Sequence, residues 1–505
     1  MVRAVRATRR GSHVRDGNRE RRYSGPRTAP GSAEWPSSHP SDSVPPDQPL
    51  TAHQKSTNLA VVLLSLAVGI VLADSAIVTL ALPSILRDFH ADVSEVAWIL
   101  TGFNLVLAVA AVPAARICAR GGAGYAGAVG LVAFALASAG CALAGTLGVL
   151  IVSRVVQAIG GALVIAACLE LLVAASRDER RGVGRWVAAG VAGSAVGPVV
   201  GGLMTEAISW QSIFIVQVPL VLLAVPVALR LRSGVERHDA GSDRPDIPAN
   251  LALAFVSAAL TAALFLLVLL LVEGWRRSPA LAAVTVSAIP LAAVAAGPLA
   301  RVIRAGIRAE AIAGAILVGG GLACLALLPD ANPWWTVPPQ ILVGMGLGLT
   351  VDSLTRSALR ERMPRALHGG WTIAARHGGI VVGLVILTPI FTSDLQQAQR
   401  PAQEAITAQV LDSDLPTASK LRLADGLGAQ LEAEAGRVPD LSAAFTEARL
   451  PEEQAEQARE LEARLDDQLE RAATRAFRMA FLAAAALALI AIIPAVFLRQ
   501  RTPSS

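Results

Sequence analysis

A carboxylate within an apolar stretch is the feature of this sequence most able to do chemistry. Asp74 lies inside the run of apolar residues from Leu59 to Leu86. A charged side chain at the centre of a membrane-spanning helix costs roughly 3 kcal/mol on insertion scales, and intramembrane acids commonly bind protons or ions. The position of Asp74 therefore predicts a proton-coupling site inside a membrane.

An arginine at a similar depth is the natural partner of this acid. At the rise of an α-helix, Asp74 lies about 24 Å from the start of its apolar run. Arg154 lies about 10 Å into a later run that begins at the opposite surface, so the two share a level to within about one helical turn. A nearby arginine favours the charged carboxylate, whereas desolvation disfavours it. Making and breaking this pair would couple protonation to movement; a permanent structural ion pair is the alternative.

The composition is that of an integral membrane protein. The 505 residues are 53% hydrophobic and only 16% charged, which is too apolar for a soluble domain of this length. The net charge of +5 is not gathered into a basic patch with interleaved aromatic residues, so nucleic-acid binding is not expected. The four cysteines have no metal-ligand spacing, and there is no phosphate-binding loop or nucleophile–base cluster. We therefore expect no metal, no cofactor and no enzymatic activity.

Twelve stretches are long and apolar enough to cross a hydrocarbon layer, which takes about 20 residues. The sequence predicts an all-α membrane protein with spans at 58–86, 96–117, 125–145, 147–174, 185–206, 211–231, 250–273, 279–300, 309–328, 336–359, 368–391 and 475–498.

Arginines predict the orientation of these spans. Short loops on the side of the N-terminus carry most of them, including Arg177, Arg180 and Arg181, whereas the opposite short loops hold only Arg87, Arg276 and Arg277. Positive residues concentrate in cytoplasmic loops. We therefore expect a multi-pass protein of the bacterial plasma membrane with both termini cytoplasmic.

The spans divide into two halves. We expect a disordered cytoplasmic tail at 1–57, a six-helix half at 58–231, a polar cytoplasmic linker at 232–249, a second six-helix half at 250–498 and a short cytoplasmic tail at 499–505. The second half contains a long extracytoplasmic loop at 393–474, in which acidic residues outnumber basic ones seventeen to eight. Leu461, Leu465 and Leu469 recur every four residues near its end, which predicts a helix that continues into the last span. This loop is a solvated extension, a surface for an extracytoplasmic partner or a lid on the outer exit.

Several motifs in order resemble the drug:proton antiporters of the major facilitator superfamily. The first span carries ADSAIVTLALPSI (73–85), the fourth LIVSRVVQAIGGA (150–162), the fifth GSAVGPVVGG (193–202) and the eleventh ALHGGWTIAARHGGIVVG (366–383). The resemblance implies two six-helix halves around a central cavity, with Asp74 as the proton site and Arg154 as its modulator. It also implies an antiporter motif made of Gly193, Gly197, Pro198, Gly201 and Gly202. Glycines spaced by four let a neighbouring helix approach closely.

One segment departs from the family pattern. The loop between the second and third spans usually carries a Gly-Leu-Ala-Asp-Arg-x-Gly-Arg type run, whose acid helps to latch the inner gate. This sequence has ARICARGGAG (115–124), so Arg120 remains but Ala119 occupies the acidic position. We expect an altered inner gate.

Other polar residues within the spans are candidates for the transport path. Asp352 and Arg376 fall in the same inner third by helical rise and, with Arg120, are candidates for an inner gate. Asn104 and Gln157 lie near the level of Asp74 and are candidates for the substrate cavity.

Together these features predict a proton-coupled secondary transporter that exports hydrophobic or cationic small molecules. One alternative is an exporter of a lipid or cell-envelope precursor that works with an extracytoplasmic partner. Another is a transporter-like sensor that no longer cycles, which the altered loop at 115–124 motivates.

Overall fold

The computed structural model describes residues 52–231, 244–303, 306–359, 362–433, 441–448 and 451–498. Nearly all of the predicted N-terminal tail, residues 232–243 of the predicted linker and the C-terminal segment 499–505 lie outside the described residues. Every regular element in the described part of the chain is helical. The prediction of an all-α protein is therefore confirmed.

The first half is a bundle of long helices, and two short helices at its end together form one further apolar span. It comprises α1 (Ala52–Asp88), α2 (Val93–Ile117), η1 (Cys118–Gly122), α3 (Ala123–Ala142), α4 (Leu147–Ser176), α5 (Glu179–Ala207), α6 (Ser212–Leu222) and α7 (Val225–Arg230). Helix α1 packs on α5, and α4 packs on both α2 and α3.

The second half repeats this pattern. It comprises α8 (Ile247–Leu269), η2 (Leu270–Gly274), α9 (Pro279–Val286), α10 (Ala288–Ile303), α11 (Ile307–Leu325), η3 (Pro333–Thr336), α12 (Val337–Leu359), α13 (Arg365–Asp412), α17 (Arg478–Ile490) and α18 (Ile492–Val496). Helix α8 packs on α13, and α12 packs on α10 and α11. The halves meet where α2 contacts α13 and where α5 contacts α9 and α10.

Helices α4 and α5 begin where the sequence provides capping side chains. The Thr146 hydroxyl accepts a hydrogen bond from the Val149 amide at 3.3 Å at the start of α4, and the Asp178 carboxylate accepts one from the Arg181 amide at 3.0 Å at the start of α5. Such caps satisfy amide groups that have no partner within the helix. Within the helices the backbone amide and carbonyl groups form hydrogen bonds with one another, as a hydrocarbon environment requires.

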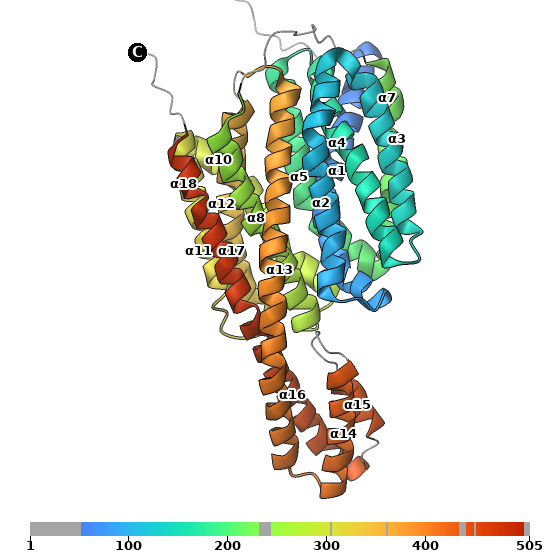
Figure 1. The fold of residues 1–505 in the computed structure, drawn as a ribbon, viewed down its shortest axis with the longest axis vertical. Helices are drawn as coiled ribbons and strands as arrows, with labels where there is room; N and C mark the ends of the chain where they lie inside the picture. The colour runs from blue at the N-terminus through green and yellow to red at the C-terminus, as the bar shows by residue number, and fades with distance from the viewer. Residues whose placement is uncertain are drawn as a thin grey trace, which may run out of the picture. The chain divides into compact units, whose positions relative to one another are not determined.

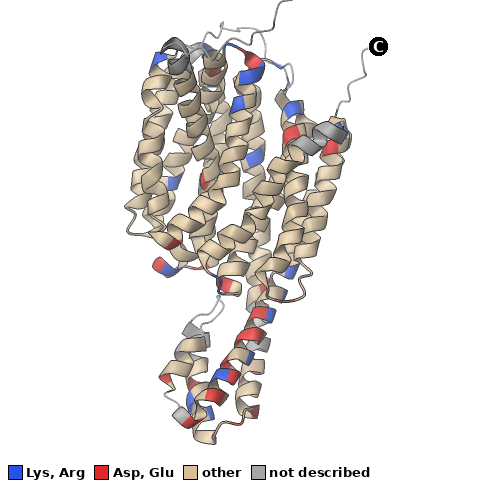
Figure 2. Cartoon of the chain, turned by 180° about the vertical axis from the view of Figure 1, so that it is seen from behind, with Lys and Arg blue, Asp and Glu red and all other residues tan. Residues whose placement is uncertain are grey.

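Eleven of the described helices are long and apolar enough to cross a membrane. Helix α12, at the position of the predicted tenth span, is not among them, and it carries Asp352 and Arg356. The structure thus supports a multi-pass membrane protein. Because α12 does not qualify as a candidate span, the total of twelve spans stays a prediction. Figure 2 accordingly shows charged residues mainly at the ends of the bundle and in the helices of the predicted long loop at 393–474.

We call the end of the bundle where α1 begins the proximal end and the opposite end the distal end. Beyond the distal end, α13 continues and is joined by α14 (Thr417–Ala433), α15 (Leu441–Glu447), η4 (Glu452–Gln454) and α16 (Ala455–Ala476), as Figure 1 shows. These loop helices have a hydrophobic core of their own, which contains Leu461, Leu465 and Leu469. A single residue, Phe477, separates α16 from α17, so the predicted helix into the last span is nearly continuous.

Candidate functional site

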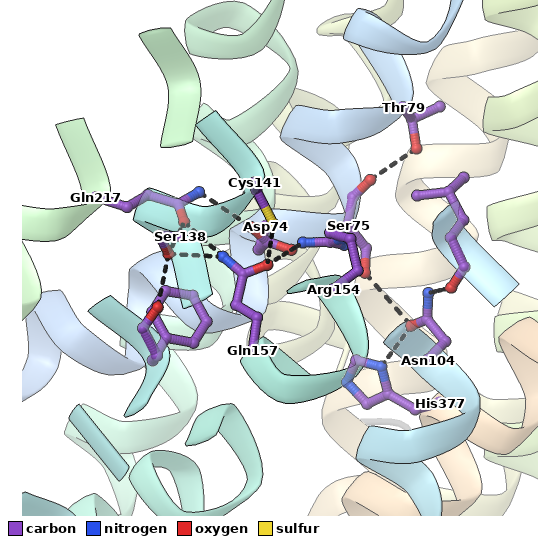
Figure 3. A network of polar contacts seen from close by, with 12 residues as sticks. Asp74, Ser75, Thr79, Asn104, Ser138, Cys141, Arg154, Gln157, Gln217 and His377 are labelled. Atoms are coloured by element: carbon purple, nitrogen blue, oxygen red, sulfur yellow. Dashed lines mark hydrogen bonds and ion pairs between the residues drawn. The ribbon is translucent and has the colours of Figure 1, made fainter. Parts of the chain in front are cut away.

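The Asp74 carboxylate lies in the middle of α1 and is fully buried. One of its oxygens, Oδ2, forms an ion pair with Nη1 of Arg154 from α4. The other, Oδ1, accepts a hydrogen bond of 3.0 Å from Nε2 of Gln217 in α6. The structure therefore brings together the two residues that the sequence predicted as a pair, inside the first half (Figure 3).

Arg154 is held by only one edge of its guanidinium group. Nη1 donates to Asp74 and, at 2.6 Å, to Oε1 of Gln157, whereas Nε and Nη2 are buried and have no hydrogen-bond partner among the described residues. The guanidinium carbon lies 3.9 Å from the centre of the Phe103 ring, a cation–π contact. Pairs of arginine and carboxylate are frequently bidentate. The single-nitrogen contact leaves donors free for another arrangement of the pair.

Neutral polar groups complete the network around this ion pair. Nε2 of Gln157 donates to the Ser138 hydroxyl at 2.7 Å and to Oε1 of Gln217 at 3.1 Å. Gln157 is fully buried within the first half. The sequence interpretation missed Ser138 and Gln217; the signal for Gln217 was an amide within the apolar run of the sixth span.

The glycine motif of α5 lies where its sequence pattern implies a close helix contact. A methyl group on Gly193 would come within 2.1 Å of the Gly69 carbonyl oxygen in α1, and one on Gly201 within 2.5 Å of the Ile77 carbonyl oxygen. Gly197 faces the same helix. Gly202 instead faces α9 of the second half, where an added methyl group would come within 2.3 Å of the Ala283 Cβ atom. These glycines let α5 pack closely against α1 of its own half and α9 of the second half.

A cavity of about 730 Å³ lies between the two halves. Its lining comes from α1, α5, α8, α10, α11, α12 and α13 and is mostly apolar. Ser75, Thr79 and Pro198 lie on the wall of the first half, and Arg376 and His377 on that of the second. The volume is within the range of about 300–1,000 Å³ that is typical of small-molecule sites.

Asn104 connects α1 to the second half beside this cavity. Its Oδ1 atom accepts a 3.3 Å hydrogen bond from the Ser75 hydroxyl and lies 2.7 Å from Nδ1 of His377. Its Nδ2 atom donates to the Leu100 carbonyl oxygen at 2.7 Å. Asn104 is fully buried and is not part of the cavity lining, and the same holds for Gln157. Asn104 therefore lies directly behind the wall, whereas Gln157 lies deeper, in the network around Asp74 and Arg154.

The predicted inner-gate residues do not form one cluster in this structure. The Asp352 carboxylate lies 3.1 Å from Nη2 of Arg356 in the next turn of α12. Arg376 instead donates to the Ser194 hydroxyl of α5 at 3.2 Å. Arg120 lies in η1. Asp352 and Arg376 both line the central cavity, but each bonds to a different neighbour there.

Carboxylates of the first half cap helices of the second half at both ends of the bundle. At the proximal end, Glu170 of α4 accepts a 3.2 Å hydrogen bond from the amide of Ala366, the second residue of α13. At the distal end, Glu206 of α5 accepts a 2.6 Å bond from the amide of Ala280, the second residue of α9. A carboxylate at a helix N-terminus also interacts favourably with the helix dipole.

The chain is similar to known membrane transport proteins. The family model described as the Major Facilitator Superfamily matches residues 64–384, more than half of the chain. The tetracenomycin C resistance and export protein of Streptomyces glaucescens is 35% identical over 33% of this chain and 32% of its own length. The methylenomycin A resistance protein of Streptomyces coelicolor is 33% identical over 46% of this chain and 48% of its own length. The chain thus matches about a third to a half of the length of these relatives.

Solved structures share the fold. A bacterial homolog of the human lysosomal transporter Spinster, in an inward-facing and occupied conformation, aligns with a TM-score of 0.57 and 16% identity, covering 91% of this chain and 100% of that one. The same homolog in its unoccupied conformation gives a TM-score of 0.55 at 15% identity, covering 89% and 99%.

Proposed function

The chain belongs to the Major Facilitator Superfamily, and we propose that it is a secondary transporter that exports small molecules in exchange for protons. The names of its relatives, resistance and export proteins, support efflux as the direction of transport. Transport rather than catalysis also agrees with a cavity between two helical halves, the place where secondary transporters bind their cargo.

The buried pair of Asp74 and Arg154 is the observation that carries proton coupling. Both side chains are fully buried and each is the other's only charged partner among the described contacts. A buried charge that loses its partner is strongly disfavoured. Protonation of Asp74 would therefore release Arg154, whose unpartnered Nε and Nη2 can take new acceptors.

Movement of α1 would transmit this change to the cavity. Asp74 and the cavity-lining Ser75 are adjacent in α1. The glycines of α5 leave α1 in direct backbone contact with α5, so a shift of α1 also moves the helix that contacts the second half. Alternating access by rocking of the two halves is the general mode of such folds.

The apolar lining supports cargo that is largely hydrophobic. The sequence resemblance implies hydrophobic or cationic cargo; the two cavity acids that would attract a cation, Glu310 and Asp352, both pair with Arg356. We place the proximal end in the cytoplasm of a bacterial cell, because the arginine bias of the loops favours that orientation.

A second candidate is an exporter of a lipid or cell-envelope precursor, favoured by the loop helices α14–α16. Their separate core makes a folded unit at the distal end, which is where a carrier would receive such cargo. An exporter of such cargo would not transport soluble dyes.

Efflux from proteoliposomes under an imposed pH gradient tests the proposal. The probes are ethidium, N-phenyl-1-naphthylamine and 1-naphthaleneacetate, which are cationic, neutral and anionic. We expect gradient-driven transport of at least one probe by the wild type and loss of the gradient-driven part in Asp74→Asn. Asp425→Asn, an exposed acid of α14, is the matched control and should transport normally.

The outcomes separate the candidate functions. Equal gradient-driven transport by the wild type and Asp74→Asn would refute coupling through Asp74. Transport of fluorescent lipid between leaflets without dye efflux would favour the lipid exporter. Binding of probes without transport by either protein would favour a sensor that no longer cycles.

A further inference from the structure

The guanidinium group of Arg376 lines the cavity without a carboxylate partner. Among the described residues its hydrogen bond is to the Ser194 hydroxyl, at 3.2 Å, and it forms no ion pair. A charged group on an apolar wall without an opposite charge is energetically costly. The unpaired guanidinium group therefore lies at a position where a ligand in the cavity could contact it.

The other charged residues of the cavity wall, two carboxylates and one arginine, form a separate group in which both acids contact the arginine. Nη2 of Arg356 lies 2.5 Å from the Glu310 carboxylate and 3.1 Å from the Asp352 carboxylate. This group of three is nearer the proximal end, because Asp352 precedes the end of α12 by seven residues and Glu310 lies in the first turn of α11. Among the described residues, Arg376 is therefore the charged side chain of the cavity wall that has no ion-pair partner, and its charge is positive.

His377 lies on the same wall and is hydrogen-bonded to Asn104 behind it. The Nδ2 atom of Asn104 donates to the Leu100 carbonyl, so Oδ1 faces His377 and must accept from a protonated Nδ1. In a neutral ring Nε2 then carries a lone pair, and it has no hydrogen-bond partner among the described residues. Nε2 is itself buried, so the contact that His377 makes is with Asn104 and not with cargo.

We propose that the cargo is an amphipathic acid: an apolar body with one anionic group that pairs with Arg376. This inference rests on the proposed transport function, because it takes the cavity as the cargo site. The anionic group would accept from the guanidinium in the place where Ser194 is now the acceptor. The apolar body would lie along the aliphatic wall formed by residues such as Val191, Leu260, Leu264 and Ile289.

The pair of Arg376 and His377 also links the cargo to the proton site. His377 bonds Asn104, and Asn104 accepts from Ser75, the neighbour of Asp74 in α1 (Figure 3). An anion that draws Arg376 away from Ser194 would therefore act on a wall that shares hydrogen bonds with α1.

Equilibrium binding to the full-length protein in phosphatidylcholine nanodiscs, without a gradient, tests the inference. The probes are 1-naphthaleneacetate, 1-naphthaleneacetamide and 1-naphthylmethylammonium, which share a ring system and differ in charge. We expect the wild type to bind the acid at least about ten-fold more tightly than the amide, since a charge-assisted bond replaces a neutral one. The ammonium probe should bind more weakly than the amide.

Variants assign the preference to one side chain. Arg376→Gln should bind acid and amide equally, and Arg376→Lys should retain part of the preference and guards against misfolding of the glutamine variant. Arg185→Gln, an exposed arginine of α5, should behave as the wild type. An equal affinity of the wild type for acid and amide, or an unchanged ratio in a folded Arg376→Gln, would overturn the inference.

Two further measurements separate it from the proposed function and from a lipid ligand. Asp74→Asn should keep the preference for the acid, so failure of proton coupling leaves this result standing. In nanodiscs that contain phosphatidylglycerol, weaker acid binding that depends on Arg376 would assign the anionic group to a lipid phosphate. Unchanged binding would assign it to a free acid.

Discussion

Asp74 and Ser75 are neighbours in α1 but face different parts of the molecule. Asp74 pairs with Arg154 inside the first half, whereas Ser75 lines the cavity between the halves. The carboxylate is thus separated from the cavity by its own helix. Under the proposed function, cargo and proton would bind to different side chains, and the position of α1 would link them.

The dependence of the fold on the buried ion pair is the first prediction. Arg154→Gln leaves Asp74 buried without its cation, and breaking a buried pair in this way costs about 3–5 kcal/mol. We expect a large fall in thermal stability in detergent. The double variant Asp74→Asn, Arg154→Gln should recover most of it, because no unpaired charge remains. Losses that simply add in the double variant would show that the two side chains do not interact.

The close contact of α1 with α5 gives the second prediction. Gly193→Ala would place a methyl group 2.1 Å from the Gly69 carbonyl oxygen, so the helix backbones must separate. Overpacking of this kind costs typically about 1–3 kcal/mol, and a lower melting temperature should report it. Gly184→Ala is the control on the same helix, since nothing lies within 4 Å of its added methyl group. That change should be neutral or slightly stabilising, because alanine favours helix.

The two helix-capping carboxylates give the third prediction. Glu170→Gln weakens the contact with α13 at the proximal end, and Glu206→Gln weakens the contact with α9 at the distal end. Each charge at a helix N-terminus is worth about 0.3–1 kcal/mol, and up to about 2 when partly buried. The two variants should therefore shift the balance of conformations in opposite directions.

Distances between spin labels measure this shift. One label pair across the proximal ends of α4 and α13 and one across the distal ends of α5 and α9 report each opening separately. Glu170→Gln should lengthen the proximal distances and Glu206→Gln the distal ones. The same response from both variants would mean that these bonds stabilise the fold in general and not one closed end.

Sequence reasoning reached the fold and the central ion pair because both depend on distance along a helix. Apolar length predicts spans, and helical rise placed Asp74 and Arg154 at one level. Rise says nothing about which face of a helix meets which neighbour. Rise also suggested a pair of Asp352 and Arg376; both line the cavity, but Asp352 lies beside Arg356, one turn away on its own helix. The roles of Ser75, Ser194 and Gln217 depend on helix rotation and could not be predicted from the sequence.

The residues of the antiporter motif illustrate the same limit. Their spacing of four predicted a close helix contact, and the structure places Gly193 and Gly201 against α1. The different orientation of Gly202, toward α9 of the second half, follows from where the second half packs. The proton and gating roles of these residues remain predictions that only transport measurements can test.

The core of the loop helices gives the last prediction. Leu465 of α16 is fully buried in that core, and Leu465→Ala should destabilise α14–α16 by about 2–5 kcal/mol. Leu421→Ala, at a side chain that is 60% exposed on α14, should have little effect. Hydrogen exchange measures the change: amides of α14–α16 should lose protection in Leu465→Ala, whereas those of α1–α5 should not. Transport by Leu465→Ala then decides the role of the loop, because a solvated extension can unfold without consequence and a lid or partner surface cannot.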